Sequence, residues 1–152
     1  MILLEEKFSV FPKNEKTNIS FPFRVTQDIK ALKFTFSYSP KRLDDMDRAK
    51  LLIENCIKKD AGEYAQEYSS WESFLPLKNL ITLSVDDSVA YRGCAHRQAE
   101  YMEHIISESF ASPGFNKGEI KPGIWKAVLN IHGVVTEKID CSLKVEAGEF
   151  NE

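Results

Sequence analysis

Apolar and polar residues alternate through most of the apolar segments of this chain, and this period of two restricts the fold more than any other feature. The alternation is clearest in segments 31–39 and 79–87, and it recurs in segments 18–26, 124–133 and 139–146. Side chains of a β-strand point alternately to its two faces, so each segment is predicted to form a strand with one buried face. Strands with one buried and one wetter face are typical of antiparallel sheets.

Two further segments, 3–11 and 100–109, are rich in β-forming residues but alternate less regularly. About seven strands of this kind indicate two packed sheets. A length of 152 residues fits one domain. The sequence therefore predicts a single all-β domain over residues 1–152, an antiparallel β-sandwich that is jelly-roll-like. The order of its strands does not follow from the pattern.

The segment 41–76 interrupts the alternation and is predicted to be a helical insertion between strands. From residue 44 to residue 59 the apolar residues fall at helical spacing. Asp44 or Asp45 can cap the start of the helix, and Gly62 can end it. A second apolar stripe is formed by Tyr64, Tyr68, Trp71 and Leu75. We expect the insertion to cap one end of the sandwich, while docking of a partner protein on the helix is the alternative.

Charge and cysteine content exclude several classes of protein. The formal net charge is −3 and no block of lysine or arginine stands out, which argues against binding to nucleic acid. No apolar stretch approaches the length of a membrane-spanning helix, and the first ten residues lack the pattern of a secretory signal. Three cysteines far apart in the sequence are typical of reduced thiols. These features predict a cytoplasmic protein with no membrane contact.

The segment 91–98, YRGCAHRQ, concentrates two arginines and a histidine and is interpreted as a loop. A second histidine lies on the polar face of segment 124–133, so the two segments could bring their side chains together. An arginine guanidinium offers a rigid fork of donors that suits a carboxylate, a phosphate or sugar hydroxyls. The predicted ligand-binding residues are Arg92, His96, Arg97, His132 and Asp86.

The same cluster has a structural interpretation that the sequence leaves open. The carboxylates of Asp86, Asp87, Glu100 and Glu103 flank the segment. An arginine that pairs with one of them would pin the loop in place, and its sequence would look the same. The third histidine, His104, is interpreted as a satisfied or half-buried side chain and not as a ligand.

A catalytic interpretation of the segment is the alternative. Arg92, His96 and Arg97 would give the Cys94 thiol an electropositive setting, which suits a nucleophile. A spacing of two residues leaves open whether His96 can reach that thiol as its base. A metal held by these residues would need more ligands, yet the chain has neither a C-x-x-C nor an H-x-x-x-H spacing. No metal or cofactor is therefore predicted, and Cys94 is expected to fill a small buried slot.

Three segments, 75–98, 111–135 and 139–146, together resemble the N-terminal β-sandwich domain that precedes the catalytic domain in some PHP-type metal-dependent phosphoesterases. The matching residues are Leu80 to Asp86, Arg92-Gly93, His96-Arg97, Ser112 to Phe115, Gly123, Trp125 and His132. The catalytic domain of that family carries a His-x-His pair, which this chain lacks. The resemblance therefore implies an accessory domain and not a phosphoesterase.

Taken together, the sequence predicts a non-catalytic binding or accessory module. Its expected ligand is a small polar or anionic molecule, with carbohydrate included, or a partner protein. The resemblance suggests a metallohydrolase as that partner, and sheet edges and the helix suggest self-association. The competing hypothesis is a small enzyme that uses His96 with Cys94 or a bound metal.

Overall fold

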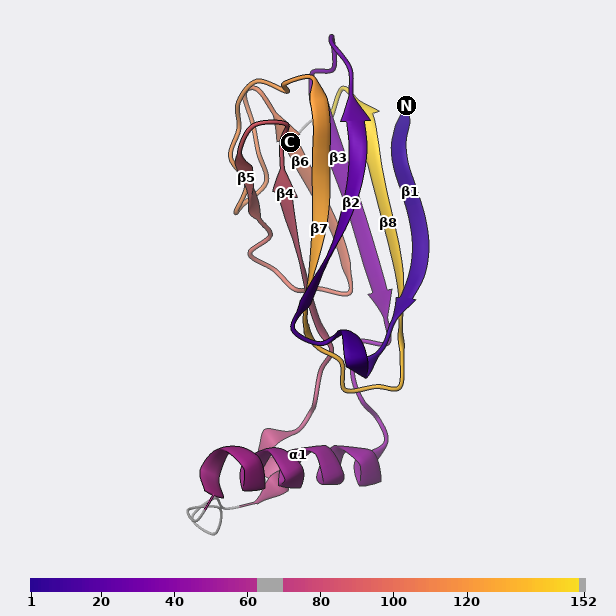
Figure 1. The fold of residues 1–152 in the computed structure, drawn as a ribbon, viewed down its shortest axis with the longest axis vertical. Helices are drawn as coiled ribbons and strands as arrows, with labels where there is room; N and C mark the ends of the chain where they lie inside the picture. The colour runs from indigo at the N-terminus through magenta and orange to yellow at the C-terminus, as the bar shows by residue number, and fades with distance from the viewer. Residues whose placement is uncertain (63–69, 151–152) are drawn as a thin grey trace.

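The computed structural model describes residues 1–62 and 70–150 and shows a β-sandwich with a helical insertion at one end (Figure 1). Tyr64 and Tyr68, assigned above to an apolar stripe, lie outside the described residues. The strands are β1 (Ile2–Val10), β2 (Thr17–Val25), β3 (Ala31–Ser39), β4 (Leu80–Asp86), β5 (Tyr91–Cys94), β6 (Tyr101–Ser107), β7 (Gly123–Gly133) and β8 (Ile139–Gly148). The helices are α1 (Met46–Ala61) and the 3₁₀ turns η1 (Pro12–Asn14) and η3 (Trp71–Phe74).

The eight strands form two four-stranded sheets, and each pairing within them is antiparallel. Sheet A has the order β1-β8-β3-β6 and sheet B the order β2-β7-β4-β5. The chain crosses to the other sheet at every connection except the one between β4 and β5, which is the strand order of a jelly roll. The prediction of an all-β, jelly-roll-like sandwich is confirmed.

The core lies between the two sheets and is built from the apolar sets of the alternating segments. Leu32, Phe34 and Phe36 of β3 are fully buried, as is Trp125 of β7. Phe23 of sheet B joins the layers, because its ring lies 5.9 Å from that of Phe34 and 6.4 Å from that of Trp125. Aromatic contacts at this separation add to the stabilisation that burial provides.

The interpretation of 91–98 as a loop is wrong for its first half. Residues 91–94 form β5, which pairs with β4 at the edge of sheet B. The strand is short, and the pairing shifts register between Val85 and Asp86. Gly93 has a φ of +116°, which glycine adopts readily, and the absence of a side chain lets it lie against the backbone of Gly114, where a Cβ would collide with Gly114 O. A four-residue strand with such an irregularity leaves little periodic signal in a sequence.

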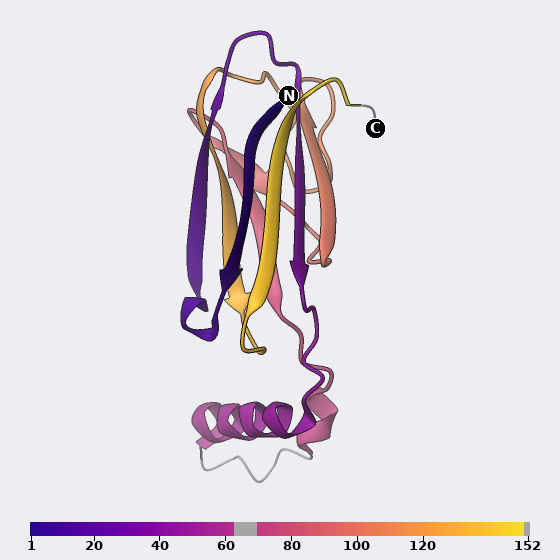
Figure 2. The ribbon, with the colours of Figure 1, turned by 90° about the vertical axis from the view of Figure 1, so that its right-hand side faces the viewer.

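The helical insertion emerges from the end of the sandwich between β3 and β4 (Figures 1 and 2). Its two arms pair with each other, since Leu43 N donates to Leu77 O at 3.0 Å and Asn79 N to Lys41 O at 2.8 Å. Asp45 caps α1 by accepting a hydrogen bond from Arg48 N at 3.1 Å. The insertion was predicted over 41–76, and both described helical elements other than η1 fall within it.

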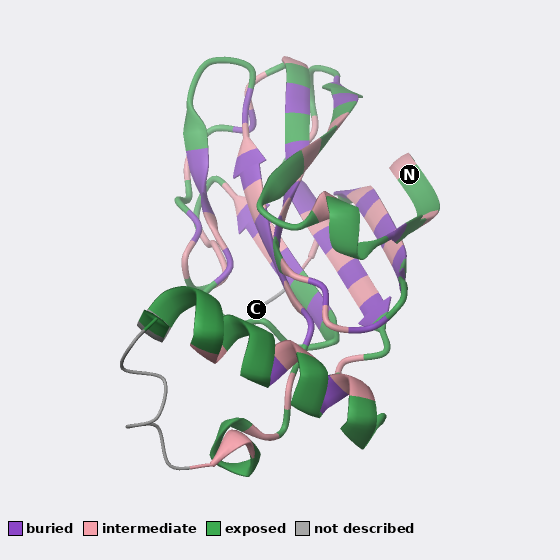
Figure 3. Cartoon of the chain, turned by 60° about the horizontal axis from the view of Figure 1, so that its bottom comes forward, coloured by how far each residue is buried: buried purple, intermediate pink, exposed green. Residues whose placement is uncertain are grey.

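α1 lies across the sandwich end and reaches it through a few contacts (Figure 3). Arg48 Nε donates a hydrogen bond to Val135 O at 2.8 Å. Ala49 and Ile53 are buried, whereas Leu51 on the opposite side of the helix is 60% exposed.

In the described ranges, 1–62 and 70–150, no helix is long and apolar enough to cross a membrane.

Candidate functional site

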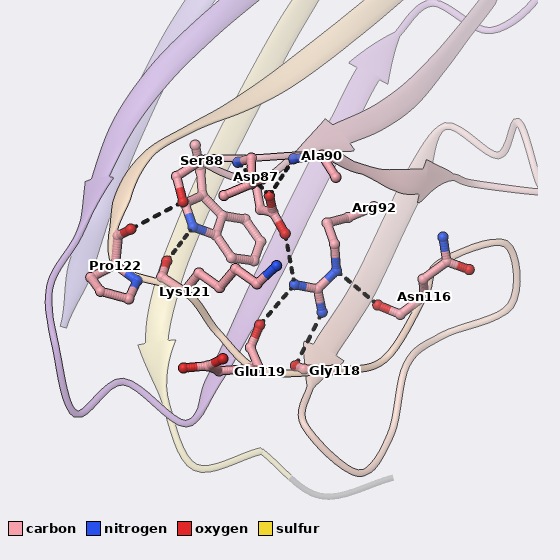
Figure 4. A network of polar contacts seen from close by, with 11 residues as sticks. Asp87, Ser88, Ala90, Arg92, Asn116, Gly118, Glu119, Lys121 and Pro122 are labelled. Atoms are coloured by element: carbon pink, nitrogen blue, oxygen red, sulfur yellow. Dashed lines mark hydrogen bonds and ion pairs between the residues drawn. The ribbon is translucent and has the colours of Figure 1, made fainter.

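Arg92 of β5 is the most enclosed of the predicted ligand-binding residues (Figure 4). Its side chain is buried, and the guanidinium carbon lies 5.2 Å from the centre of the Trp125 ring. Nη1 forms an ion pair with Asp87 Oδ2 at 3.2 Å. Stacking on an indole and pairing with a carboxylate are both arrangements that suit the flat, permanently charged guanidinium group.

The remaining donors of Arg92 bind backbone carbonyls of the long connection between β6 and β7. Nε donates to Asn116 O at 3.0 Å, Nη2 to Gly118 O at 3.1 Å and Nη1 to Glu119 O at 2.9 Å. These bonds hold that connection against β5. The structure therefore places Arg92 in a structural role, as an arginine pinned by the protein's own acceptors.

Asp87 completes this network and shapes the turn between β4 and β5. Its Oδ1 accepts hydrogen bonds from Val89 N at 2.7 Å and Ala90 N at 2.6 Å. Burial by itself would raise the pKa of the Asp87 carboxyl, but the two amides and the Arg92 guanidinium outweigh it and leave that pKa below its ordinary value. The neighbouring Asp86, which was predicted as a ligand residue, points to the outer face of sheet B opposite Lys126 and Tyr91.

His96 and Arg97 follow the end of β5 and are exposed. The His96 ring packs against Gly114, since a Cβ at that glycine would lie only 2.9 Å from His96 Cδ2. Within residues 1–62 and 70–150, no hydrogen bond or ion pair holds either side chain. Both side chains are thus accessible to a ligand.

His132 belongs to a row of polar side chains on the outer face of sheet B. Its Nε2 lies 2.9 Å from Thr82 Oγ1, which also accepts a hydrogen bond from Asn130 Nδ2 at 3.1 Å. Asn130 reaches Ser84 Oγ at 3.4 Å. Thr82 and Asn130 are direct partners across β4 and β7, so the row is a consequence of strand register.

The structure therefore divides the predicted site. His132 and Asp86 lie on the outer face of sheet B, whereas Arg92 turns inward onto Trp125. Thr82 and Asn130 join His132, although the sequence did not single them out. Both stand on the polar face of alternating segments, which was the available signal, but their contact depends on a register that the sequence does not reveal.

The groups of the catalytic hypothesis are present but not linked. Cys94 is half-buried, and its Sγ lies 3.7 Å from Ala95 O. Among the described residues, His96 makes no hydrogen bond to this thiol. No group of three or more histidine, cysteine or acidic side chains that could hold a metal ion occurs in the part of the chain that the structure describes.

Comparison with known proteins adds no family to this description. No protein-family model matches the chain, and no curated protein matches it. The resemblance to the accessory domain of PHP-type phosphoesterases accordingly stays a prediction.

Proposed function

We propose that the chain is a non-catalytic binding or accessory module that takes a small polar or anionic ligand on the outer face of sheet B. The observation that carries this proposal is the hydrogen-bonded row of His132, Thr82 and Asn130. Polar side chains that orient one another before a ligand arrives lose little entropy on binding. Such a row is a suitable base for recognising hydrogen-bonding groups.

Charge favours an anion as the ligand. Arg97 presents an exposed fork of donors, and His96 next to it in the segment after β5 is exposed as well. A guanidinium group can donate two parallel hydrogen bonds to two oxygens of one carboxylate or phosphate group. Arg92 contributes indirectly in this proposal, because it fixes the backbone of β5 from which His96 and Arg97 follow.

A partner protein is the alternative ligand, and its support is the resemblance described above. That resemblance favours a metallohydrolase, while the exposed edges of both sheets favour a second copy of the chain. The three free cysteines support a reducing, cytoplasmic setting.

Binding of small anions tests this function directly. Citrate, inorganic phosphate and glucose 6-phosphate serve as probes in a thermal-shift screen, followed by calorimetric measurement of the Kd. Arg97→Ala is expected to raise the Kd by about tenfold, since a charge-assisted hydrogen bond contributes about 1.5–3 kcal/mol before solvent screening. His132→Ala should raise it as well.

Arg24→Ala is the matched control, because Arg24 is exposed on β2 near the opposite end of the same sheet. It should leave the Kd unchanged. The function is rejected if none of the probes raises the Tm, or if Arg97→Ala and Arg24→Ala alter the affinity equally.

A further inference from the structure

The outer face of sheet A carries a hollow that lies on the opposite side of the sandwich from the site just described. Its cavity volume is about 660 Å³, within the usual range of ligand pockets. It crosses β1, β8 and β3 and ends at the segment before β6. The residues that line it are Lys7, Phe8, Ser9, Ser37, Tyr38, Ser39, Glu100, Asp140, Cys141 and Ser142.

Strand register explains why the face is hollow at this place. Ser142 of β8 lies directly opposite Ser37 of β3, and Asp140 lies opposite Ser39. Residues directly opposite each other in an antiparallel pair project from the same face. Short serine side chains on the two central strands therefore leave space between taller neighbours.

Long charged side chains stand next to the hollow on the same face. Lys144 lies two residues along β8 from Ser142, and it forms an ion pair with Glu146 at 3.5 Å. Lys33 of β3 approaches the same carboxylate at 3.9 Å. Along the strands, the hollow therefore adjoins charged side chains that pair with one another. The floor of the hollow itself is formed by short serine side chains.

The groups in the hollow suit hydroxyl-rich ligands. In the described part of the chain, the hydroxyls of Ser37, Ser39 and Ser142 make no hydrogen bond, and a hydroxyl both donates and accepts. Asp140 Oδ1 accepts a hydrogen bond from Ser9 Oγ at 2.7 Å, which orients that carboxylate. Carboxylate oxygens accept hydrogen bonds from neighbouring hydroxyls of a ligand.

The charges around the hollow nearly cancel. Asp140, Glu100 and Lys7 line the hollow, and Lys138 outside it lies 3.6 Å from Asp140 Oδ1, so two carboxylates are matched by two ammonium groups. This balance disfavours a strongly charged ligand of either sign, because such a ligand would approach a group of its own charge at the rim of the hollow.

An aromatic ring stands at the end of the serine row. Tyr101 of β6 lies opposite Ser37, is 57% exposed, and donates from its hydroxyl to Glu103 Oε1 at 2.6 Å. The hydrogen bond limits movement of the ring. An exposed aromatic ring offers an apolar face on which the C–H groups of a sugar ring can pack while the sugar hydroxyls reach the serines.

From these observations we propose that the hollow on sheet A binds a neutral oligosaccharide. The serine hydroxyls and Asp140 contact its hydroxyl groups, and Tyr101 packs against one sugar ring. The site is separate from the anion site on sheet B, so either can fail without the other.

The probes are cellotetraose, maltotetraose, xylotetraose, mannotetraose and chitotetraose, with tetragalacturonate as the anionic comparison, and titration calorimetry gives the Kd. The full chain carrying Ser37→Leu with Ser142→Leu fills the hollow and should abolish binding. Tyr101→Ala should raise the Kd by about tenfold. Ser20→Leu and Tyr91→Ala are matched controls on sheet B, since Ser20 lies on its outer face and Tyr91 is as exposed as Tyr101, at 58%.

Saturable binding of at least one neutral probe, lost in the hollow variants and kept in the controls, supports the proposal. Thermal unfolding of each variant checks that it is folded. If the double serine variant does not fold, Tyr101→Ala still tests the proposal, because it changes a single exposed side chain. The proposal is overturned if no neutral probe binds, if tetragalacturonate binds better than all of them, or if binding survives both Tyr101→Ala and the filled hollow.

Discussion

At the residue scale, the guanidinium of Arg92 connects three different parts of the fold. It bonds to the β4–β5 turn through Asp87, to the β6–β7 connection through three carbonyls, and to the core through Trp125. A buried ion pair adds little net stability by itself, but removal of one partner leaves the other charge buried without compensation. The residue should therefore matter for folding more than for binding.

Arg92→Ala is expected to lower the free energy of unfolding by about 3 kcal/mol, because the Asp87 carboxylate keeps only its two amide donors. Arg92→Lys should recover only part of this loss, since an ammonium cannot reach carbonyls spread over a planar fork. Urea unfolding measures both, with Arg24→Ala as the exposed control. A lysine variant as stable as the wild type would contradict the structural role.

A second residue-scale prediction concerns His104 of β6. The imidazole is buried, its Nε2 has no hydrogen-bond partner among the described residues, and its ring lies 5.1 Å from that of Phe115. Burial disfavours the charged form and lowers the pKa of His104 below its ordinary value. The unfolded chain therefore takes up the proton more readily than the folded chain, and the stability that depends on neutral His104 is lost as pH falls below about 6.5.

His104→Phe removes this protonation while keeping a ring of similar shape. We expect the free energy of unfolding to decline less between pH 7 and pH 5 in this variant than in the wild type. Urea unfolding at several pH values measures the difference, and His96→Phe, at an exposed position, is the control. Identical pH profiles for His104→Phe and the wild type would show that His104 does not couple folding to pH.

At the scale of elements, the helical insertion is a separate unit attached by a short pair of arms. A cavity of about 280 Å³ separates α1 from part of the sandwich end. It is lined by Glu15, Leu52, Ile53, Cys56, Ile57, Phe74, Leu77, Val134 and Val135. The two arms, by contrast, pair through their backbones as antiparallel segments, with a β-bridge between Arg42 and Lys78. The arms at 41–43 and 77–79 thus connect β3 to β4 without help from the helix.

Replacing residues 44–76 by an Asn-Gly turn is expected to leave the sandwich folded. The two arms already pair, and Asn-Gly closes two antiparallel segments with a favourable turn. The variant loses the Arg48–Val135 hydrogen bond and the buried side chains of Ala49 and Ile53, so its Tm should fall by several degrees. Far-UV circular dichroism and thermal unfolding measure the outcome. A variant without cooperative unfolding would show that the insertion is part of the core.

At the scale of the whole molecule, local pattern and long-range pairing differ in how well they can be predicted. The alternation in segment 31–39 correctly identified Leu32, Phe34, Phe36 and Tyr38 as core residues, because burial of a strand face depends on local periodicity. The pairing of β1 with β8 could not be predicted, since it joins Val10 to Ile139 and no local signal encodes it. Likewise, the carbonyl acceptors of Arg92 lie 24 to 27 residues away in the sequence.

This long-range pairing has a kinetic consequence. The first and last strands lie side by side, and the amino group of Met1 donates to Ala147 O at 3.0 Å, so both ends of the sandwich sequence meet at one edge of sheet A (Figure 1). Folding must close a loop of nearly the whole chain before that pairing forms, and contacts between distant residues slow folding.

A circular permutant tests this consequence. A flexible linker joins the two ends, and new ends are opened between Gln27 and Asp28, in the exposed turn between β2 and β3, which lie in different sheets and do not pair. We expect the permutant to keep the free energy of unfolding within about 1 kcal/mol and to refold about tenfold faster, because the β1–β8 loop shortens from most of the chain to a few residues. Stopped-flow refolding measures the rate, and the linear chain carrying the same linker at its C-terminus is the control. Refolding no faster than this control would mean that β1 and β8 pair only after the rate-limiting step, as a late addition to a sandwich that the other six strands have already formed.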